Sequence, residues 1–123
     1  MWDIILLEPV EEWFLGLCRD DPESANRVTE ALDHLALEGP TLGRPMVDRI
    51  RGSVLHNLKE LRPGSSGGSE IRMLFVFDAE RCAVILVAGD KAGRWAQWYE
   101  ESIATAERRY GQYADSRKRE DQA

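Results

Sequence analysis

Three cationic side chains lie at the ends or on one parity of short apolar runs in the middle of the chain. Arg62 ends the first run, Arg72 lies inside the second, and Lys91 follows the third. Guanidinium and ammonium groups donate charge-assisted hydrogen bonds to phosphate oxygens, so phosphate binding is the chemistry that suits such a group. We expect the three side chains to converge on one exposed face of a sheet and to bind a phosphate backbone.

The position of Arg72 is unusual, because its neighbours in residues 71–77 are apolar. Burying a guanidinium charge without a partner costs several kcal/mol. We therefore expect Arg72 to meet either a carboxylate or solvent in a concavity.

An antiparallel meander would position these cations. Residues 54–62, 71–77 and 82–88 have the length and apolar character of strands, and turn residues separate them. Alternate residues of the central run form a bulky set that suits the helix-packed side, Ile71, Met73, Phe75 and Phe77, and an opposite set, Arg72, Leu74 and Val76. The pattern of residues 54–62 does not decide which side packs. Residues 63–69 are expected to form a flexible hairpin loop.

Helices are expected before and after the meander in the sequence. Residues 2–7 suit a first strand that joins the central sheet, and residues 10–18 have the apolar spacing of an amphipathic helix. Asp21 and Pro22 supply a cap and a first residue for a second helix, which Gly39 ends. The two helices are predicted to form a hairpin that packs on the sheet.

Two other segments complete the predicted organisation. Residues 41–53 have no clear periodicity and are interpreted as a long irregular connection bordering the site. Its cations are Arg44, Arg49 and Arg51. Residues 95–113 have helical spacing, whereas residues 116–123 are charged without apolar residues. We expect one domain over residues 1–115, followed by a charged, disordered tail.

Length and composition restrict the class of protein. With 123 residues, 43% of them hydrophobic and 31% charged, the chain suits a single soluble globular domain. Its longest apolar run is too short to cross a membrane, and no cationic region precedes the first apolar residues as in a secretory signal. Cys18 and Cys82 lack the spacing of a metal site. We expect a cytoplasmic protein that uses no metal or other cofactor.

The net charge of −6 argues against nucleic-acid binding at first sight, but the charge is unevenly distributed. Residues 1–42 contain 2 basic and 10 acidic residues, whereas residues 43–95 contain 9 basic and 6 acidic ones. Charges are screened beyond a Debye length of ~8 Å, so a positive sheet can still bind a polyanion. Solvated carboxylates on helix surfaces explain the same distribution without any function.

The order of these elements and three groups of residues resemble the RelE/ParE toxin superfamily. The residues are Leu58-Lys59-Glu60-Leu61-Arg62, Ile71-Arg72-Met73-Leu74-Phe75, and Gly89-Asp90-Lys91 followed by Trp95, Trp98 and Tyr99. They are similar to the HigB-like branch of type II toxin–antitoxin modules, over residues 2–113. The implied fold is α+β, with an N-terminal strand and a helical hairpin packed on a mainly antiparallel sheet, and a C-terminal helix.

The resemblance implies a toxin that inhibits translation as a metal-independent, ribosome-dependent mRNA endoribonuclease (an mRNA interferase). It implies a cognate helix-turn-helix antitoxin, the ribosome and mRNA as partners. Operator DNA would be bound only through the antitoxin, and no membrane partner is implied. One alternative is a catalytically inactive or ParE-like binding protein of the same fold, which acts on another target such as DNA gyrase. A purely regulatory or structural partner is a third reading.

Site residues follow from the same resemblance, position by position. Arg72 matches the arginine that contacts the scissile phosphate, and Lys91 matches the basic residue after the last strand. Tyr99 is the candidate for the C-terminal catalytic or stacking aromatic, with Trp98 and Trp95 as rivals. The expected catalytic residues are Arg72, Lys91, Tyr99 and Glu60, and the expected RNA contacts are Lys59, Arg62, Arg94 and Trp95.

Cleavage by a 2′-hydroxyl needs a base, cations for the pentacoordinate phosphate and an acid for the leaving 5′-oxygen. The planar fork of Arg72 suits two phosphate oxygens. Glu60 is a candidate base if it shares a face with Arg62 and Arg72, and a salt-bridge partner for either arginine otherwise. His56 is an alternative base or a structural residue.

The charge of this chain differs in two ways from that of the toxins that it resembles. Most of those are basic, whereas this chain is acidic, and Asp90 places a carboxylate beside Lys91. The antitoxin surface is open between the acidic helix pair, residues 10–38, and the cationic rim of the sheet.

Overall fold

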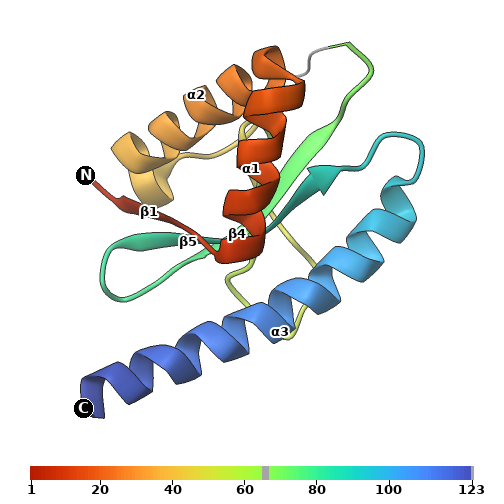
Figure 1. The fold of residues 1–123 in the computed structure, drawn as a ribbon. Helices are drawn as coiled ribbons and strands as arrows, with labels where there is room; N and C mark the ends of the chain where they lie inside the picture. The colour runs from red at the N-terminus through yellow and green to blue at the C-terminus, as the bar shows by residue number, and fades with distance from the viewer. Residues whose placement is uncertain (65–66, 123) are drawn as a thin grey trace.

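The computed structural model describes residues 1–64 and 67–122. The chain folds into a five-stranded sheet with helices on both faces (Figure 1). The elements are β1 Asp3–Leu6, α1 Glu8–Asp20, α2 Pro22–Glu38, the 3-10 turn η1 Gly39–Thr41, β2 Val47–Arg49, β3 Lys59–Leu61, β4 Ile71–Phe77, β5 Cys82–Asp90 and α3 Trp95–Gln122. The α+β class expected from the sequence is confirmed. In the described part of the chain, no helix is long and apolar enough to cross a membrane.

The sheet has the strand order β1-β5-β4-β3-β2. Strands β2 to β5 pair antiparallel, and β1 pairs parallel to β5. The β4–β5 turn is tight because Oδ1 of Asp78 accepts hydrogen bonds from the backbone N–H groups of Glu80 and Cys82. Arg81 completes this turn with a φ of 62°. The predicted meander and the joining N-terminal strand are therefore confirmed.

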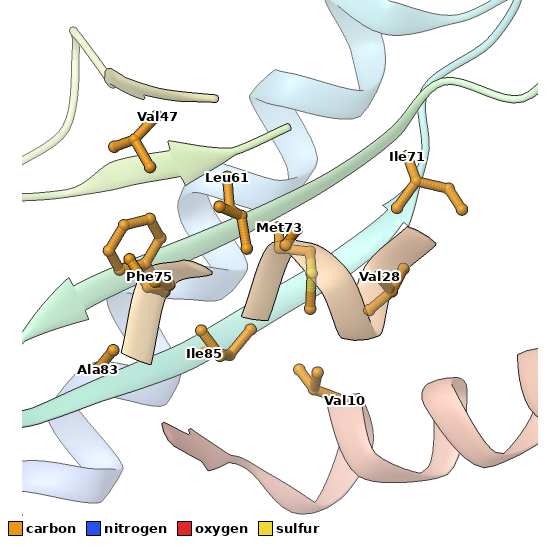
Figure 2. Close-up of a cluster of buried hydrophobic side chains, with 11 residues drawn as sticks. Val10, Val28, Val47, Leu61, Ile71, Met73, Phe75, Ala83 and Ile85 are labelled. Atoms are coloured by element: carbon orange, nitrogen blue, oxygen red, sulfur yellow. The ribbon is translucent and has the colours of Figure 1, made fainter. Parts of the chain in front are cut away.

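The helical hairpin, α1 and α2, covers one face of the sheet. Helix α2 begins as predicted, because the carboxylate of Asp21 accepts a hydrogen bond from the backbone N–H of Ser24 at 3.3 Å and Pro22 occupies the first turn. Figure 2 shows the buried cluster on this face, with hairpin valines and sheet side chains facing one another: Val10, Val28, Met73, Phe75 and Ile85. The bulky alternate set of β4 thus packs toward the hairpin, as its period predicts.

Helix α3 covers the opposite face, which is therefore not the open surface that the sequence suggested. Leu74 and Val76 of β4 pack there against Trp98 and other α3 side chains. Gly89 at the end of β5 permits this close approach, since a Cβ at this position would lie 2.7 Å from Nε1 of Trp98. A groove remains at the end of the sheet beside the first turns of α3.

Two predictions about residues 41–62 are wrong. Residues 47–49 form β2 inside the segment expected to be irregular, and β3 spans three residues instead of residues 54–62. The chain leaves the sheet before β3 because Oε2 of Glu107 on α3 accepts hydrogen bonds from Oγ of Ser53 at 2.8 Å and from the backbone N–H of Val54 at 2.9 Å. Part of the expected hairpin loop, residues 65–66, lies outside the described residues.

Helix α3 continues to Gln122, through most of the segment that the sequence predicts to be a charged tail. Arg117 forms an ion pair with Glu80 and lies over the ring of Tyr113, 5.8 Å from its centroid. The hydroxyl of Tyr113 donates to Oδ2 of Asp78 at 3.1 Å. These contacts hold the distal part of the helix against the β4–β5 turn.

Candidate functional site

A groove of about 520 Å³ lies where the first turns of α3 meet β2, β3 and the end of β5. The charged side chains that line it are Arg44, Arg49, Arg51, Arg62, Lys91, Asp48 and Glu60. Cations thus outnumber carboxylates by five to two. In a chain of net charge −6, this local excess makes the groove the candidate site for an anion.

Glu60 lies at the bottom of the groove and is only 3% exposed. It faces α3 because it lies opposite Leu74 in the β3–β4 register. Oε2 of Glu60 accepts a 2.5 Å hydrogen bond from the hydroxyl of Tyr99, and Nε of Arg62 donates to Oε1 at 2.7 Å. Both oxygens of this buried carboxylate are therefore satisfied by protein groups, and it pairs with Arg62 rather than with Arg72.

Tyr99 retains its proton in this environment. Burial raises the pKa of its hydroxyl far above the ordinary tyrosine value, and the hydrogen bond and negative charge of Glu60 raise it further. The charges of Arg72 and Arg62 act in the opposite direction but are weaker. Tyr99 is accordingly a neutral phenol that donates its hydrogen bond to Oε2 of Glu60.

Asp48 connects two arginines at the rim of the groove. Its Oδ2 lies 3.3 Å from Nη2 of Arg62, and its Oδ1 lies 3.2 Å from Nε of Arg44. The hydrogen bond from the backbone N–H of Arg49, followed by that from Arg44, lowers the pKa of Asp48. Arg62 therefore has carboxylates on two sides, which reduces its capacity to bind another anion.

Arg72 and Lys91 lack such carboxylate partners. Within residues 1–64 and 67–122, neither takes part in an ion pair. Nη1 of Arg72 donates to the carbonyl of Ile71 at 2.8 Å, but its buried Nε has no hydrogen-bond partner among the described residues. Burial, followed by repulsion from Arg72, lowers the pKa of Lys91. Two neighbouring cations without an ion-pair partner among the described residues favour the binding of an anion.

The carboxylate of Asp90, which directly precedes Lys91 in the sequence, does not pair with either cation. Its Oδ1 accepts hydrogen bonds from the backbone N–H groups of Glu70 and Ala92, both at 2.9 Å. Asp90 is thus used to shape the turn after β5, and it leaves Lys91 available.

Aromatic rings border the cationic pair. Nζ of Lys91 lies 5.1 Å from the ring centroid of Tyr99 and 5.4 Å from that of Trp95. Trp95 is 59% exposed, so one face of its indole is accessible from solvent. Trp98 is buried and packs edge-on against Tyr99, which makes it a core residue rather than a rival for the site. Such rings suit stacking with an unpaired base.

The structure does not bring every expected residue to the groove. Lys59 lies opposite Phe75 on the hairpin side, with its Nζ over the ring of Phe77. Arg94 pairs with Glu101 at 2.7 Å, outside the groove. His56 is exposed in the segment before β3, and it does not line the groove either.

Three groove cations were not among the expected site residues, namely Arg44, Arg49 and Arg51. Their only signal in the sequence is the basic character of residues 41–53. In the described part of the chain, no group of three or more His, Cys, Asp or Glu residues is placed to hold a metal ion.

Comparisons with known proteins show the family to which the chain belongs. Residues 13–111 match the family described as "Phage derived protein Gp49-like (DUF891)". The chain is 52% identical over 106 residues to "Putative toxin HigB3" of Mycobacterium tuberculosis, covering 86% of this chain and 88% of that protein. It is 49% identical over 107 residues to "Putative toxin HigB2" of the same organism, but spans only 52% of that protein. No solved structure matches significantly. The chain belongs to the phage-derived Gp49-like family and is a homologue of the mycobacterial HigB proteins.

Proposed function

We propose that this protein is the toxin of a type II toxin–antitoxin pair and that it inhibits translation by cutting mRNA on the ribosome without a metal. The names of its two relatives support the toxin assignment. A cognate antitoxin is then the expected protein partner, and the ribosome and mRNA are the expected targets. The resemblance to RelE/ParE-type nucleases supports the reaction.

The observation that carries the proposal is the pair formed by Arg72 and Lys91. Among the described residues neither cation forms an ion pair. Lys91 lines the groove and lies over the ring of Tyr99, and the charge of Arg72 acts on Tyr99 and on Lys91, although Arg72 itself does not line the groove. A scissile phosphate bound here would receive hydrogen bonds that strengthen as negative charge develops. Removing one such donor from a transition state costs roughly 10²–10³ in rate.

The proposed reaction proceeds by attack of the 2′-hydroxyl oxygen on the adjacent phosphorus. The new O–P bond forms as the bond to the 5′-oxygen breaks. Water takes the proton of the 2′-hydroxyl and another water protonates the leaving 5′-oxygen, giving a cyclic phosphate and a free 5′-hydroxyl. Arg72 and Lys91 stabilise the charge on the phosphate oxygens. Glu60 is too deeply buried to touch the substrate directly, so it does not serve as the base that contacts the 2′-hydroxyl.

The first test is Arg72→Ala expressed without antitoxin. We expect loss of growth arrest and loss of new mRNA 5′ ends in primer extension, with a thermal melting curve close to that of the wild type. Arg72→Lys keeps a charge but lacks the fork, and is expected to restore only part of the activity. Arg19→Ala, at an exposed position on α1, is the matched control and should arrest growth normally.

Persistent toxicity of a folded Arg72→Ala variant would refute the nuclease proposal. Toxicity with DNA-damage signalling and without mRNA cuts would instead support the gyrase-directed alternative.

A further inference from the structure

A second cavity, of about 590 Å³, lies between the start of α1 and the distal part of α3. Glu8 belongs to one wall, and Arg108, Arg109, Gln112 and Ser116 of α3 belong to the other. Among the described residues, none lines both this cavity and the groove. Small-molecule sites have volumes of about 300–1,000 Å³. The cavity is therefore large enough to hold a small ligand, independently of the groove.

Side chains that can donate hydrogen bonds gather on the α3 wall. Arg108, Gln112 and Ser116 are spaced by four residues, so they follow one another along one face of the helix. Arg109 lies beside this row with its side chain partly buried. Its Nη1 donates to the carbonyl of Leu86 on β5 at 2.8 Å, which fixes the guanidinium and leaves its other N–H groups for a ligand.

The two arginines of this cavity have no carboxylate partner. In the described parts of the chain, neither Arg108 nor Arg109 forms an ion pair, and Glu8 on the opposite wall does not pair with either. Burial, followed by repulsion from Arg108, lowers the pKa of Arg109. Two adjacent guanidinium groups in this state favour an anion in the cavity.

The start of α1 adds a smaller contribution of the same sign. Leu7 precedes the helix without a side-chain hydrogen bond to its first N–H groups, and a helix N-terminus carries a partial positive charge. Leu7 and Glu8 both line the cavity, so this end of α1 faces the arginines of α3 (Figure 1). The carboxylate of Glu8 acts in the opposite direction and limits the affinity for an anion.

We propose that this cavity binds a small phosphate monoester, with Arg108 and Arg109 as the residues that hold the phosphate. A carboxylate has two oxygens and one charge, which a single guanidinium satisfies in a bidentate contact. A phosphate monoester has three terminal oxygens and up to two charges, which match two guanidinium groups. The ligand would connect the start of α1 to α3, and the site does not depend on the reaction proposed for the groove.

Nuclear magnetic resonance tests this site separately from the cations of the groove. Inorganic phosphate is titrated into the ¹⁵N-labelled full-length protein at constant ionic strength, and the Nε–H of Arg109 and the backbone amides of Glu8 and Gln112 are followed. We expect saturable shifts with a dissociation constant on the order of 1 mM. Arg108→Gln and Arg109→Gln should each raise this constant roughly tenfold or more, because each removes a charge-assisted contact.

Arg119→Gln is the matched control, because it removes the same charge from an exposed position of α3 outside the cavity. Its phosphate affinity should equal that of the wild type, and Arg72→Ala should likewise leave the shifts of the cavity unchanged. Glu8→Gln should bind phosphate about two- to fivefold more tightly, because it removes a repulsive charge. A structural defect alone would not tighten binding.

Dimethyl phosphate distinguishes a small monoester from the backbone of a nucleic acid as the source of the phosphate. It has a single charge and two terminal oxygens, so it should bind at least about fivefold more weakly than inorganic phosphate. Equal binding of the diester would overturn the proposal, as would shifts that do not saturate. Unchanged affinity in Arg108→Gln would also overturn it, and because Arg108 is exposed, this variant remains decisive if Arg109→Gln fails to fold.

Discussion

At the scale of single residues, the cations of the groove and the neighbouring Arg72 divide by whether a carboxylate already holds them. Arg62 contacts Glu60 and Asp48, whereas Arg72 and Lys91 contact neither. A guanidinium that must leave a carboxylate before it binds phosphate gains less than one that starts without a partner. Arg62 therefore serves mainly to hold Glu60, and we propose that Arg72 and Lys91 bind the ligand.

Asp48 offers a direct test of this division. Asp48→Asn removes the charge that holds Arg44 and Arg62 but keeps an oxygen for the backbone N–H of Arg49. We expect RNA affinity to rise by up to about fivefold, the range of an exposed ion pair. Anisotropy titration measures this, with exposed Asp33→Asn on α2 as the control. Unchanged or weaker binding would show that Asp48 does not compete with RNA.

At the scale of elements, the start of α3 builds the site. It carries Trp95 and Tyr99 on consecutive turns, and buried Trp98 anchors it against Gly89 of β5. Further along the same helix, Glu107 holds the segment that leads into β3. One long helix thus fixes both walls of the groove relative to the sheet.

Gly89→Ala tests the anchoring of α3. The added Cβ would lie 2.7 Å from Nε1 of Trp98, so the ring or the strand must shift. We expect the free energy of unfolding to fall by about 1–3 kcal/mol in urea denaturation. Gly111→Ala, in the same helix with no atom within 4 Å, should instead gain roughly 0.8–1 kcal/mol. An unchanged Gly89→Ala stability would mean that α3 is not held by this contact.

At the scale of the whole molecule, the sheet separates two surfaces of opposite character. The acidic hairpin packs on one face, and α3 with the cationic groove lies on the other (Figure 1). The sheet and the dissolved salt ions screen the groove from the carboxylates of the hairpin. A chain of net charge −6 can therefore present a site for a polyanion.

Neutralising the hairpin tests this separation. The double variant Glu11→Gln/Glu12→Gln removes two exposed charges from α1. At physiological salt we expect the RNA dissociation constant to change by less than about twofold, because screening acts over ~8 Å. At low salt the variant should bind more tightly than the wild type. A tenfold change at physiological salt would place these carboxylates close to the bound RNA.

Local sequence patterns determined the longer elements of this protein. The period of two in β4, the cap and proline at the start of α2, and the tight turn at Asp78 are properties of adjacent residues, so they could be read before the fold was known. The same patterns supported the α+β class and pointed to Arg72 and Lys91 as candidates, whereas Tyr99 became a candidate through the resemblance to RelE/ParE toxins.

Tertiary structure decided the short strands and the state of each charge. Strands β2 and β3 have three residues each, too few to show a period, and they exist because they pair with each other and with β4. Lys59 turned to the hairpin face for the same reason. The partners of Glu60 show the general cause: Tyr99 lies 39 residues away in the chain, and only packing of α3 on the sheet brings its hydroxyl to the carboxylate.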